Sequence, residues 1–416
     1  MYIVSSQFQD YSFNFEVTNM SSEKTIQIEN NYFAPFYNRL PISFEYANGS
    51  LAYDEEGKEY IDMTSGWGTT PLGHSHKNVI SAINDQANRI IQNPCISLTY
   101  SPVRAELLEI LQPILPEGLT RLFFSNSGAE ANDAAIKLAR KITGRLDIIS
   151  TEKSFHGRTT STISATGQLT HRNKFNPLLS NYVFVPFNQA EAIKKVINKN
   201  VAAIILEPIQ GEGGINMPDE GYLSEVSQIC EENGSLLILD EIQTGYGRVG
   251  KMFFSKGMGL KIDFLTMAKG LANGYPISFF AMTEEVACKL EIGDHGGTFC
   301  NNPLGCAAAL ATTKTLIEEK IPERVDKLGK ELLQRLDSLQ NEFPHVIKET
   351  RGKGFLIAIQ FQSGEVRDKI YQEITKSGLL TLYTQKDILR IMPVLNIKDE
   401  ILWKGINILR DVIAKI

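Results

Sequence analysis

Three chemically reactive side chains come at or just after the ends of short apolar runs in this sequence. They are Glu207, Asp240 and Lys269. Such runs predict buried strands of a mostly parallel sheet, and in open α/β sheets ligands bind at the carboxyl ends of the strands. We therefore expect the two carboxylates and the lysine to meet in one crevice, where the lysine amine can form an imine with an aldehyde.

A second motif, SNSGAEAN, follows the apolar run 122–124. Ser127 and Glu130 have the spacing of a capping box, and Gly128 lets the backbone approach a ligand closely. A helix that starts here offers free N–H groups and the positive end of its dipole to an anion such as a phosphate. Taken alone, the octet is more typical of an ordinary capped helix, because capping boxes are common.

A phosphate site, a buried carboxylate and a lysine together favour the cofactor pyridoxal phosphate. Lys269 would bind its aldehyde, and Asp240 would keep the ring nitrogen protonated so that the ring accepts electrons. Burial disfavours a charged Asp240 unless a cation pairs with it, and a pyridinium is such a cation. Phe155 would stack on the ring and Gln243 would bond its phenolic oxygen, although core packing or a turn contact explains either residue taken singly.

The segment GYGRVG at 245–250 matches the GxGxxG fingerprint of dinucleotide-binding proteins. A true fingerprint follows its strand immediately and opens a helix. Here four residues separate the segment from Asp240, and the residues after it do not read as a helix start. This context argues against a nicotinamide cofactor.

The elements that must position these residues follow from the hydrophobic pattern. Apolar runs alternate with amphipathic helical segments, which predicts an α/β fold with a mostly parallel central sheet between helices. The runs are 121–125, 146–150, 182–187, 201–206, 235–239, 263–267 and 277–282. Before them, the segment 43–63 has the turn signals of a small hairpin array.

A chain of 416 residues is too long for one hydrophobic core. We expect an N-terminal arm over 1–30, the first part of a small domain over 31–75, a large cofactor-binding domain over 76–312 and the rest of the small domain over 313–416. The small domain would be α+β and built from both ends of the chain.

Composition limits the partners. With 42 basic and 48 acidic residues and a net charge of -6, the chain is a poor candidate for binding nucleic acid or an anionic membrane. No apolar stretch approaches the ~18 residues of a membrane span, and the absence of Lys and Arg before residue 24 does not fit a secretory signal. Five cysteines without a CxxC pair argue against a metal site or a disulfide framework. We therefore expect a cytoplasmic protein.

Six motifs, in order, resemble those of the class III, pyridoxal-phosphate-dependent aminotransferases. They are SNSGAEAN, FHGRT, LEPIQGEGG, LILDEIQTGYGR, MAKGLANGYP and HGGTFCNNPLG. The match runs from about residue 30 to the C-terminus, and among subgroups the chain is most similar to the acetylornithine aminotransferases. The resemblance implies the fold type I architecture and a homodimer whose two active sites are shared between subunits.

The resemblance also implies roles for single residues. Lys269, Asp240 and Glu207 would be catalytic. The cofactor-binding residues that it implies are Ser127, Gly128, Ala129, Phe155, His156, Asp240, Gln243, Lys269 and Thr298, the last acting from the partner subunit.

For the substrates, the resemblance implies Arg158, Arg390, Glu207 and Gly297. Arg158 would contact the α-carboxylate side of the donor, and Arg390 would take the α-carboxylate of the keto acid. Because a buried, unpaired Arg390 is costly, we expect Glu207 to neutralise it while the donor reacts and then to swing away. An outward-facing arginine on an edge strand is the alternative for Arg390.

The implied reaction moves the terminal amino group of an amine or an N-acylated diamino acid to 2-oxoglutarate, giving a semialdehyde and glutamate. The first choice of donor is N2-acetylornithine, with Lys269 as the base that moves the proton. Departures from the subgroup pattern at 66–74, 272–273 and 300–301 leave ornithine, 4-aminobutyrate, diamine and β-amino acid donors open. The alternatives from other classes are a pyridoxal-phosphate aminomutase and a non-catalytic binding protein.

Overall fold

The computed structural model describes residues 21–95 and 98–416 and divides the described chain into two compact units. The smaller unit contains 21–46 and Tyr53–Glu59. It begins with helix α1 (Ser22–Tyr32), whose first turn is capped by Ser21. The sequence pattern did not predict this helix, because its apolar residues follow no clear period. The rest of the expected arm, 1–20, lies outside the described residues.

Three short strands lie within 43–63, the segment where a small hairpin array was expected. They are β1 (Phe44–Asn48), β2 (Leu51–Asp54) and β3 (Glu59–Asp62). Within the smaller unit, the rings of Tyr46 and Tyr53 stack with their centroids 4.6 Å apart, and Ser43 donates a hydrogen bond to the Glu55 carboxylate.

The larger unit is built on a seven-stranded sheet in the order β4-β10-β9-β8-β7-β5-β6. Its strands are β4 (Leu119–Ser125), β5 (Asp147–Thr151), β6 (Tyr182–Val185), β7 (Val201–Leu206), β8 (Leu236–Asp240), β9 (Phe264–Met267) and β10 (Ser278–Thr283). Within this sheet β10 runs antiparallel to both of its neighbours, and the pairs on the other side of β9 are parallel. The seven predicted runs and the mostly parallel sheet are thus confirmed.

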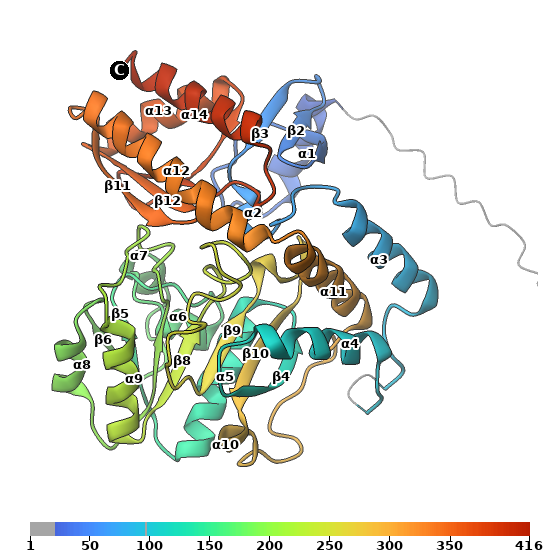
Figure 1. Cartoon of the computed structure of the whole chain (residues 1–416), viewed down its shortest axis with the longest axis vertical. Helices are drawn as coiled ribbons and strands as arrows, with labels where there is room; N and C mark the ends of the chain where they lie inside the picture. Colours follow the sequence, from blue (N-terminus) through green and yellow to red (C-terminus); the bar gives the residue numbers. More distant parts are fainter. Residues whose placement is uncertain (1–20, 96–97) are drawn as a thin grey trace, which may run out of the picture. The chain divides into compact units, whose positions relative to one another are not determined.

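Most of the helices up to α11 lie around this sheet, while α3 packs against α11 (Figure 1). They are α2 (Ser65–Gly68), α3 (Lys77–Arg89), α4 (Pro102–Leu111), α5 (Gly128–Thr143), α6 (Thr160–Ala165), α7 (Leu169–Arg172), α8 (Ala190–Val196), α9 (Tyr222–Asn233), α10 (Glu284–Ala287) and α11 (Pro303–Glu318). Helix α5 buries Ala131, Ala135 and Leu138 as the 3-4 spacing predicts, and it ends at Gly144, which has a φ of 66°.

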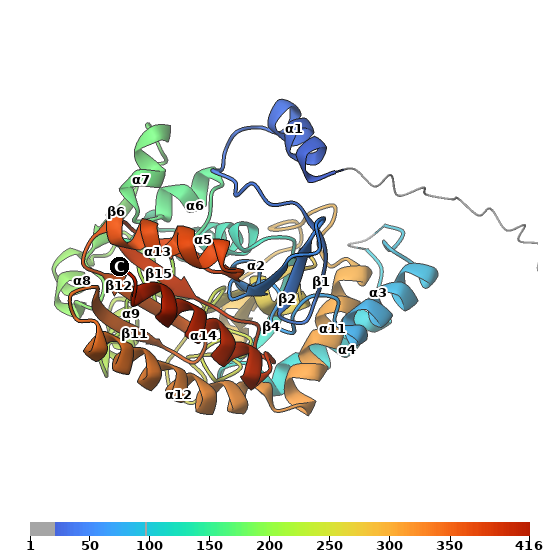
Figure 2. The same cartoon turned by 90° about the horizontal axis from the view of Figure 1, so that it is seen from above.

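A second sheet, antiparallel and in the order β11-β12-β15-β14, follows near the C-terminus. Its strands are β11 (Ile347–Lys353), β12 (Leu356–Phe361), β14 (Leu382–Thr384) and β15 (Ile388–Ile391). Helices α12 (Ile321–Glu342), α13 (Gly364–Lys376) and α14 (Asp399–Ile413) lie next to one another over it (Figure 2).

The two ends of the larger unit are joined by strand pairing. Ile61 of β3 lies opposite Leu379 of β13 (Leu379–Leu380) in a parallel pair. The domain boundaries expected from the sequence stay a prediction. Among the helices of the described residues, none is long and apolar enough to cross a membrane.

Candidate active site

A cavity of about 460 Å³ opens at the carboxyl ends of the central strands. The loops that follow β4, β5, β7, β8 and β9 line it. Ten of the residues named from the sequence contribute to its wall: Ser127, Gly128, Ala129, Phe155, His156, Arg158, Glu207, Asp240, Gln243 and Lys269. The expected convergence at this edge of the sheet is therefore present.

Lys269 follows β9 in a strained backbone conformation. Its φ of 35° lies in the left-handed region, which a residue with a side chain seldom adopts. Burial lowers the pKa of its ammonium from the usual value, although the carboxylate of Glu212 opposes this shift. The backbone thus directs into the cavity an amine that loses its proton more readily than an exposed lysine does.

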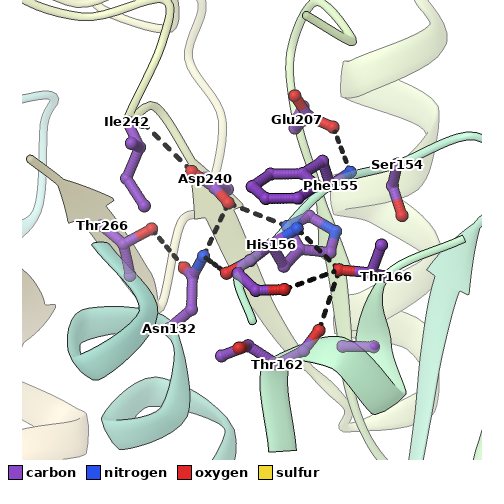
Figure 3. Close-up of polar contacts among 12 residues, drawn as sticks. Asn132, Ser154, Phe155, His156, Thr162, Thr166, Glu207, Asp240, Ile242 and Thr266 are labelled. Atoms are coloured by element: carbon purple, nitrogen blue, oxygen red, sulfur yellow. Dashed lines mark hydrogen bonds and ion pairs between the residues drawn. The ribbon is translucent and has the colours of Figure 1, made fainter. Parts of the chain in front are cut away.

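Asp240 is the last residue of β8 and is buried. Its Oδ2 accepts hydrogen bonds from Asn132 Nδ2 at 2.7 Å and from His156 Nδ1 at 2.8 Å, and its Oδ1 accepts one from the backbone N–H of Ile242 at 3.1 Å (Figure 3). These donors stabilise a negative charge that burial alone would disfavour. Oδ1 accepts only this one bond from the described chain, so it can take a further donor from the cavity.

The start of α5 has the predicted capping box. Ser127 Oγ accepts a hydrogen bond from the Glu130 N–H at 3.2 Å, and Glu130 Oε2 accepts one from the Ser127 N–H at 3.1 Å. The next N–H groups, those of Gly128 and Ala129, are in the first helical turn at the cavity wall and have no intrahelical partner. A Cβ at Gly128 would come within 2.7 Å of the Ile242 side chain. Glycine at this position therefore allows the start of α5 to pack closely against the loop after β8.

Glu207 connects two walls of the cavity. Its Oε1 accepts the backbone N–H of Phe155 at 2.9 Å, and its Oε2 accepts that of Gly211 at 3.0 Å. Burial raises the pKa of the Glu207 carboxyl to about 7. At the mouth, the exposed Arg158 has its guanidinium 5.8 Å from the centre of the Phe155 ring.

The pairing of Glu207 with Arg390 predicted from the sequence is wrong. Arg390 Nη1 bonds to Glu212 Oε1 at 2.6 Å, and both oxygens of Glu207 accept backbone N–H groups. Arg390 is completely buried because β15 lies between β12 and β14, so it is not an outward-facing arginine on an edge strand. Glu212, which sequence reasoning missed, is in the quoted motif LEPIQGEGG, where an acidic residue in a glycine-rich turn was the available signal.

Glu212 stands between the cavity, which it lines, and Arg390 behind it. Burial opposes the ionisation of Glu212, but Arg390 and Lys269 outweigh burial and hold the pKa of this carboxyl below its usual range. Nε and Nη2 of Arg390 are buried and have no partner in the part of the chain that the structure describes. A carboxylate that displaced Glu212 would therefore find unused donors.

Two predicted residues lie elsewhere. Gly297 and Thr298 are exposed and do not belong to the described residues that line the cavity. The Gln92 side chain donates to the backbone carbonyl of Thr298 at 2.8 Å. Their proposed roles require a second subunit and stay predictions.

One departure from the subgroup pattern has a structural explanation. Asn273, with a φ of 47°, accepts a hydrogen bond from the Leu72 N–H and donates one to the Gly73 carbonyl. Asparagine tolerates this left-handed conformation better than most residues do. Its side chain thus fastens the segment that follows Thr69, a residue of the cavity wall.

The residues present fit pyridoxal phosphate. The start of α5 suits its phosphate, Asp240 suits its ring nitrogen, and the Lys269 amine suits its aldehyde. The side-chain oxygen of Gln243 is buried at the cavity and finds no partner among the described residues, while a hydrogen bond from the same amide helps to hold the pKa of Glu212 below its usual range.

Comparison with known proteins agrees with this reading. A family model described as "Aminotransferase class-III" matches residues 32–413. The chain is 42% identical over 395 residues to "Acetylornithine aminotransferase" of Methanothermobacter thermautotrophicus, covering 95% of this chain and 100% of that protein. It is 38% identical over 407 residues to the protein of the same name from Methanocaldococcus jannaschii, with the same coverage.

Solved structures give the same family. The ornithine aminotransferase from Toxoplasma gondii ME49 superposes with a TM-score of 0.89 at 29% identity, covering 95% of this chain and 96% of that one. The acetylornithine aminotransferase from Elizabethkingia anophelis gives 0.84 at 30% identity, covering 95% and 100%. The chain belongs to the class III aminotransferases, and it is a pyridoxal-phosphate-dependent transaminase of fold type I.

Proposed function

We propose that this transaminase moves the terminal amino group of N2-acetylornithine to 2-oxoglutarate, giving a semialdehyde and glutamate. The observation that carries the proposal is the ion pair between Glu212 and the buried Arg390. The names and identities of the curated relatives support the choice of donor.

The ion pair suits a site that must accept two different substrates in turn. The terminal amine of an acetylated diamino acid has no carboxylate beside it, so Glu212 can stay on Arg390 while this donor reacts. The keto acid carries a carboxylate next to its reacting carbon, and that group can replace Glu212 on Arg390. Arg158, which lines the cavity, would bind the remote carboxylate of either substrate.

Pyridoxal phosphate, when bound, supplies an aldehyde that takes up the amino group and a ring that withdraws electrons from it. Lys269 Nζ then acts as the base that moves the proton, which its lowered pKa favours. Asp240 would hold the ring nitrogen in its protonated form, Phe155 would stack on the ring, and Gln243 would bond the ring oxygen. Glu207 accepts the backbone N–H groups of Phe155 and Gly211 and so fixes the two loops relative to each other.

We further propose a homodimer, in which Thr298 of the partner subunit completes the phosphate site. Large apolar side chains are exposed on two segments, one just after Gln92 and one around Thr298. Gln92 connects them, because its side chain bonds to the Thr298 carbonyl and to Asn302. Exposed apolar patches of this kind mark protein interfaces. The exposed side chains are Leu98, Tyr100, Ile292 and Phe299.

We also propose that the large cofactor-binding domain spans 76–312, with the small domain on either side of it. The protein is proposed to be cytoplasmic. The five cysteines carry free thiols, which suits a reducing compartment.

A donor screen tests the substrate. Purified holoenzyme is given 2-oxoglutarate with N2-acetylornithine, ornithine, 4-aminobutyrate, a diamine or a β-amino acid, and the glutamate formed is measured. We expect the highest kcat/KM with N2-acetylornithine. A higher value with ornithine or 4-aminobutyrate would overturn the donor, and product formation without any keto acid would indicate an aminomutase.

Replacing Arg390 tests the two-substrate site. In Arg390→Ala the keto acid loses a charge-assisted hydrogen bond, so the KM for 2-oxoglutarate should rise about 10- to 100-fold. The single-turnover rate with donor alone should stay near that of the wild type. Arg410→Ala, at an exposed position, is the control. An unchanged KM for 2-oxoglutarate would contradict the role of Arg390.

A further inference from the structure

Asn132 is a buried polar residue on a helix face that is otherwise mostly alanine and aliphatic side chains. Its Nδ2 donates to Asp240 Oδ2 at 2.7 Å and to the His156 carbonyl at 2.8 Å. Its Oδ1 accepts a hydrogen bond from Thr266 Oγ1 at 2.7 Å. Figure 3 shows this chain of contacts running from Thr266 of β9 through Asn132 to the carboxylate.

Two acceptors decide which way the Asn132 amide points, and the Thr266 hydroxyl holds its other end. With this hydroxyl donating to Oδ1, the NH₂ group faces two acceptors, the Asp240 carboxylate and the His156 carbonyl. A flipped amide would put its oxygen against both acceptors and would lose both bonds. All the donors and acceptors of this side chain are buried, so water does not compete with the arrangement.

The arrangement affects how Asp240 is presented to the cavity. Asn132 and His156 both hold Oδ2, which prevents the carboxylate from rotating and leaves Oδ1 for a donor in the cavity. An amide carries no charge, so it stabilises the anion without competing with a cationic ligand for it. Neither Asn132 nor Thr266 belongs to the described residues that line the cavity.

We propose that Asn132, held by Thr266, is a positioning residue that keeps Asp240 in place for the ring nitrogen of the cofactor. The inference rests on the proposed function, in which Asp240 binds that nitrogen. It gives Thr266, three residues before Lys269, a role in cofactor affinity without any contact with the cofactor.

The test measures the dissociation constant of pyridoxal phosphate from the apo-protein, by the visible absorbance of the bound form, together with the thermal midpoint of the apo-protein. Asn132→Ala removes a hydrogen bond to a charged group and should weaken affinity about 10-fold or more. Thr266→Val removes only the hydroxyl at nearly constant shape and should weaken it about 3- to 10-fold. Thr266→Ser keeps the hydroxyl and should bind within about two-fold of the wild type.

The double variant Asn132→Ala with Thr266→Val gives the decisive comparison. If Thr266 acts through Asn132, the double variant should bind no more weakly than Asn132→Ala alone, because coupled residues are not additive. Equal affinities of Thr266→Val and Thr266→Ser, or additive losses in the double variant, would overturn the inference. If Asn132→Ala does not fold, the matched pair at Thr266 still decides the question.

Asp240→Ala separates this inference from the function on which it rests. Weak binding in Asp240→Ala, with wild-type affinity in Asn132→Ala and Thr266→Val, would overturn the inference alone. Wild-type affinity in Asp240→Ala would remove the proposed role of Asp240 itself, and the inference with it.

Discussion

Lys269 combines two features that seldom occur together in a structural lysine: a left-handed backbone and a lowered ammonium pKa. Strain of this kind persists where the surrounding structure enforces it for function. The features support the role proposed for this amine as the group that binds the cofactor and moves the proton.

We predict that Lys269→Ala reduces transamination by at least about 10³-fold, since it removes both the covalent attachment and the base. Glutamate formation from donor and 2-oxoglutarate measures the rate. The visible absorbance of the lysine-bound cofactor should disappear in the same variant. Lys251→Ala, at an exposed position, should behave like the wild type. Turnover of Lys269→Ala at the rate of this control would exclude the role.

Glu207 makes the stability depend on pH. Its pKa rises from 4.5 to about 7 on folding, so the folded state holds a proton that the unfolded state has already lost between these values. The stabilising contribution is complete below about pH 4.5 and is lost as the pH rises through about 7, a change of about 3 kcal/mol at most.

The variant Glu207→Gln lacks this titration. We predict that the thermal midpoint of the wild type minus that of Glu207→Gln decreases between pH 5 and pH 8, at constant protein concentration. Glu191→Gln, at an exposed position, serves as the control for the loss of one carboxylate. A difference between wild type and Glu207→Gln that stays constant across this range would show that Glu207 titrates as an ordinary glutamate.

At the scale of elements, the loop that carries Glu212 is fastened to the C-terminal sheet. Thr384, the last residue of β14, and Gln385, in the turn after it, both donate to the Glu212 carbonyl. Arg351 of β11 donates to the carbonyls of Gly214 and Ile215. Ile215 has a φ of 54°, which is strained for a β-branched residue. The backbone is thus held to the same sheet as Arg390, and only the Glu212 side chain needs to move between half-reactions.

The Glu212 side chain acts as a gate, which is open when Glu212 has moved away from Arg390. Loosening the bonds that hold the Glu212 backbone should favour this open state. We predict that Thr384→Val, which removes one of the two bonds to the Glu212 carbonyl, frees Arg390 more often. Glutarate, a dicarboxylate without a reacting group, should then inhibit the donor half-reaction about 2- to 10-fold more strongly than in the wild type. Thr384→Ser keeps the hydroxyl and should restore the wild-type inhibition constant. Weaker inhibition in Thr384→Val would mean that these bonds instead hold the gate open.

At the scale of the whole molecule, the proposed dimer predicts a distinctive complementation. Thr298→Asp puts a negative charge against the phosphate and should inactivate the site of the partner subunit. Lys269→Ala should inactivate the site of the chain that carries it. In a mixed dimer of the two variants, one site would combine the intact Lys269 of one chain with the intact Thr298 of the other.

Co-expression of the two chains with different tags gives the mixed dimer. We predict about half of the wild-type activity per dimer for this species and almost none for either variant alone, because one of its two sites is fully wild type. Glutamate formation by the doubly tagged fraction is the measurement. If Thr298 acted on the site of its own chain, the mixed dimer would remain inactive.

The sequence by itself determined the strands of the sheet, the position of the cavity and ten of the residues at its wall. Strand ends are determined locally, because an apolar run buried on both faces stops at the first polar residue that must reach the crevice. Asp240 and Lys269 could therefore be placed from their positions after two such runs. The capping box at Ser127 is also a local pattern, with both partners within one helical turn.

Only the tertiary structure decided which groups pair. Arg390 meets Glu212 because the end of β14 and the turn after it hold the 212–215 loop. This contact joins segments more than 170 residues apart, and no local pattern encodes it. In the sequence, Asn132 is only one polar residue within a helical segment. Its hydrogen bond with Thr266 forms because β9 packs against that helix. Hydrogen-bond partners depend on side-chain positions within a few tenths of an ångström, and these are set by packing across the whole unit rather than by any single element.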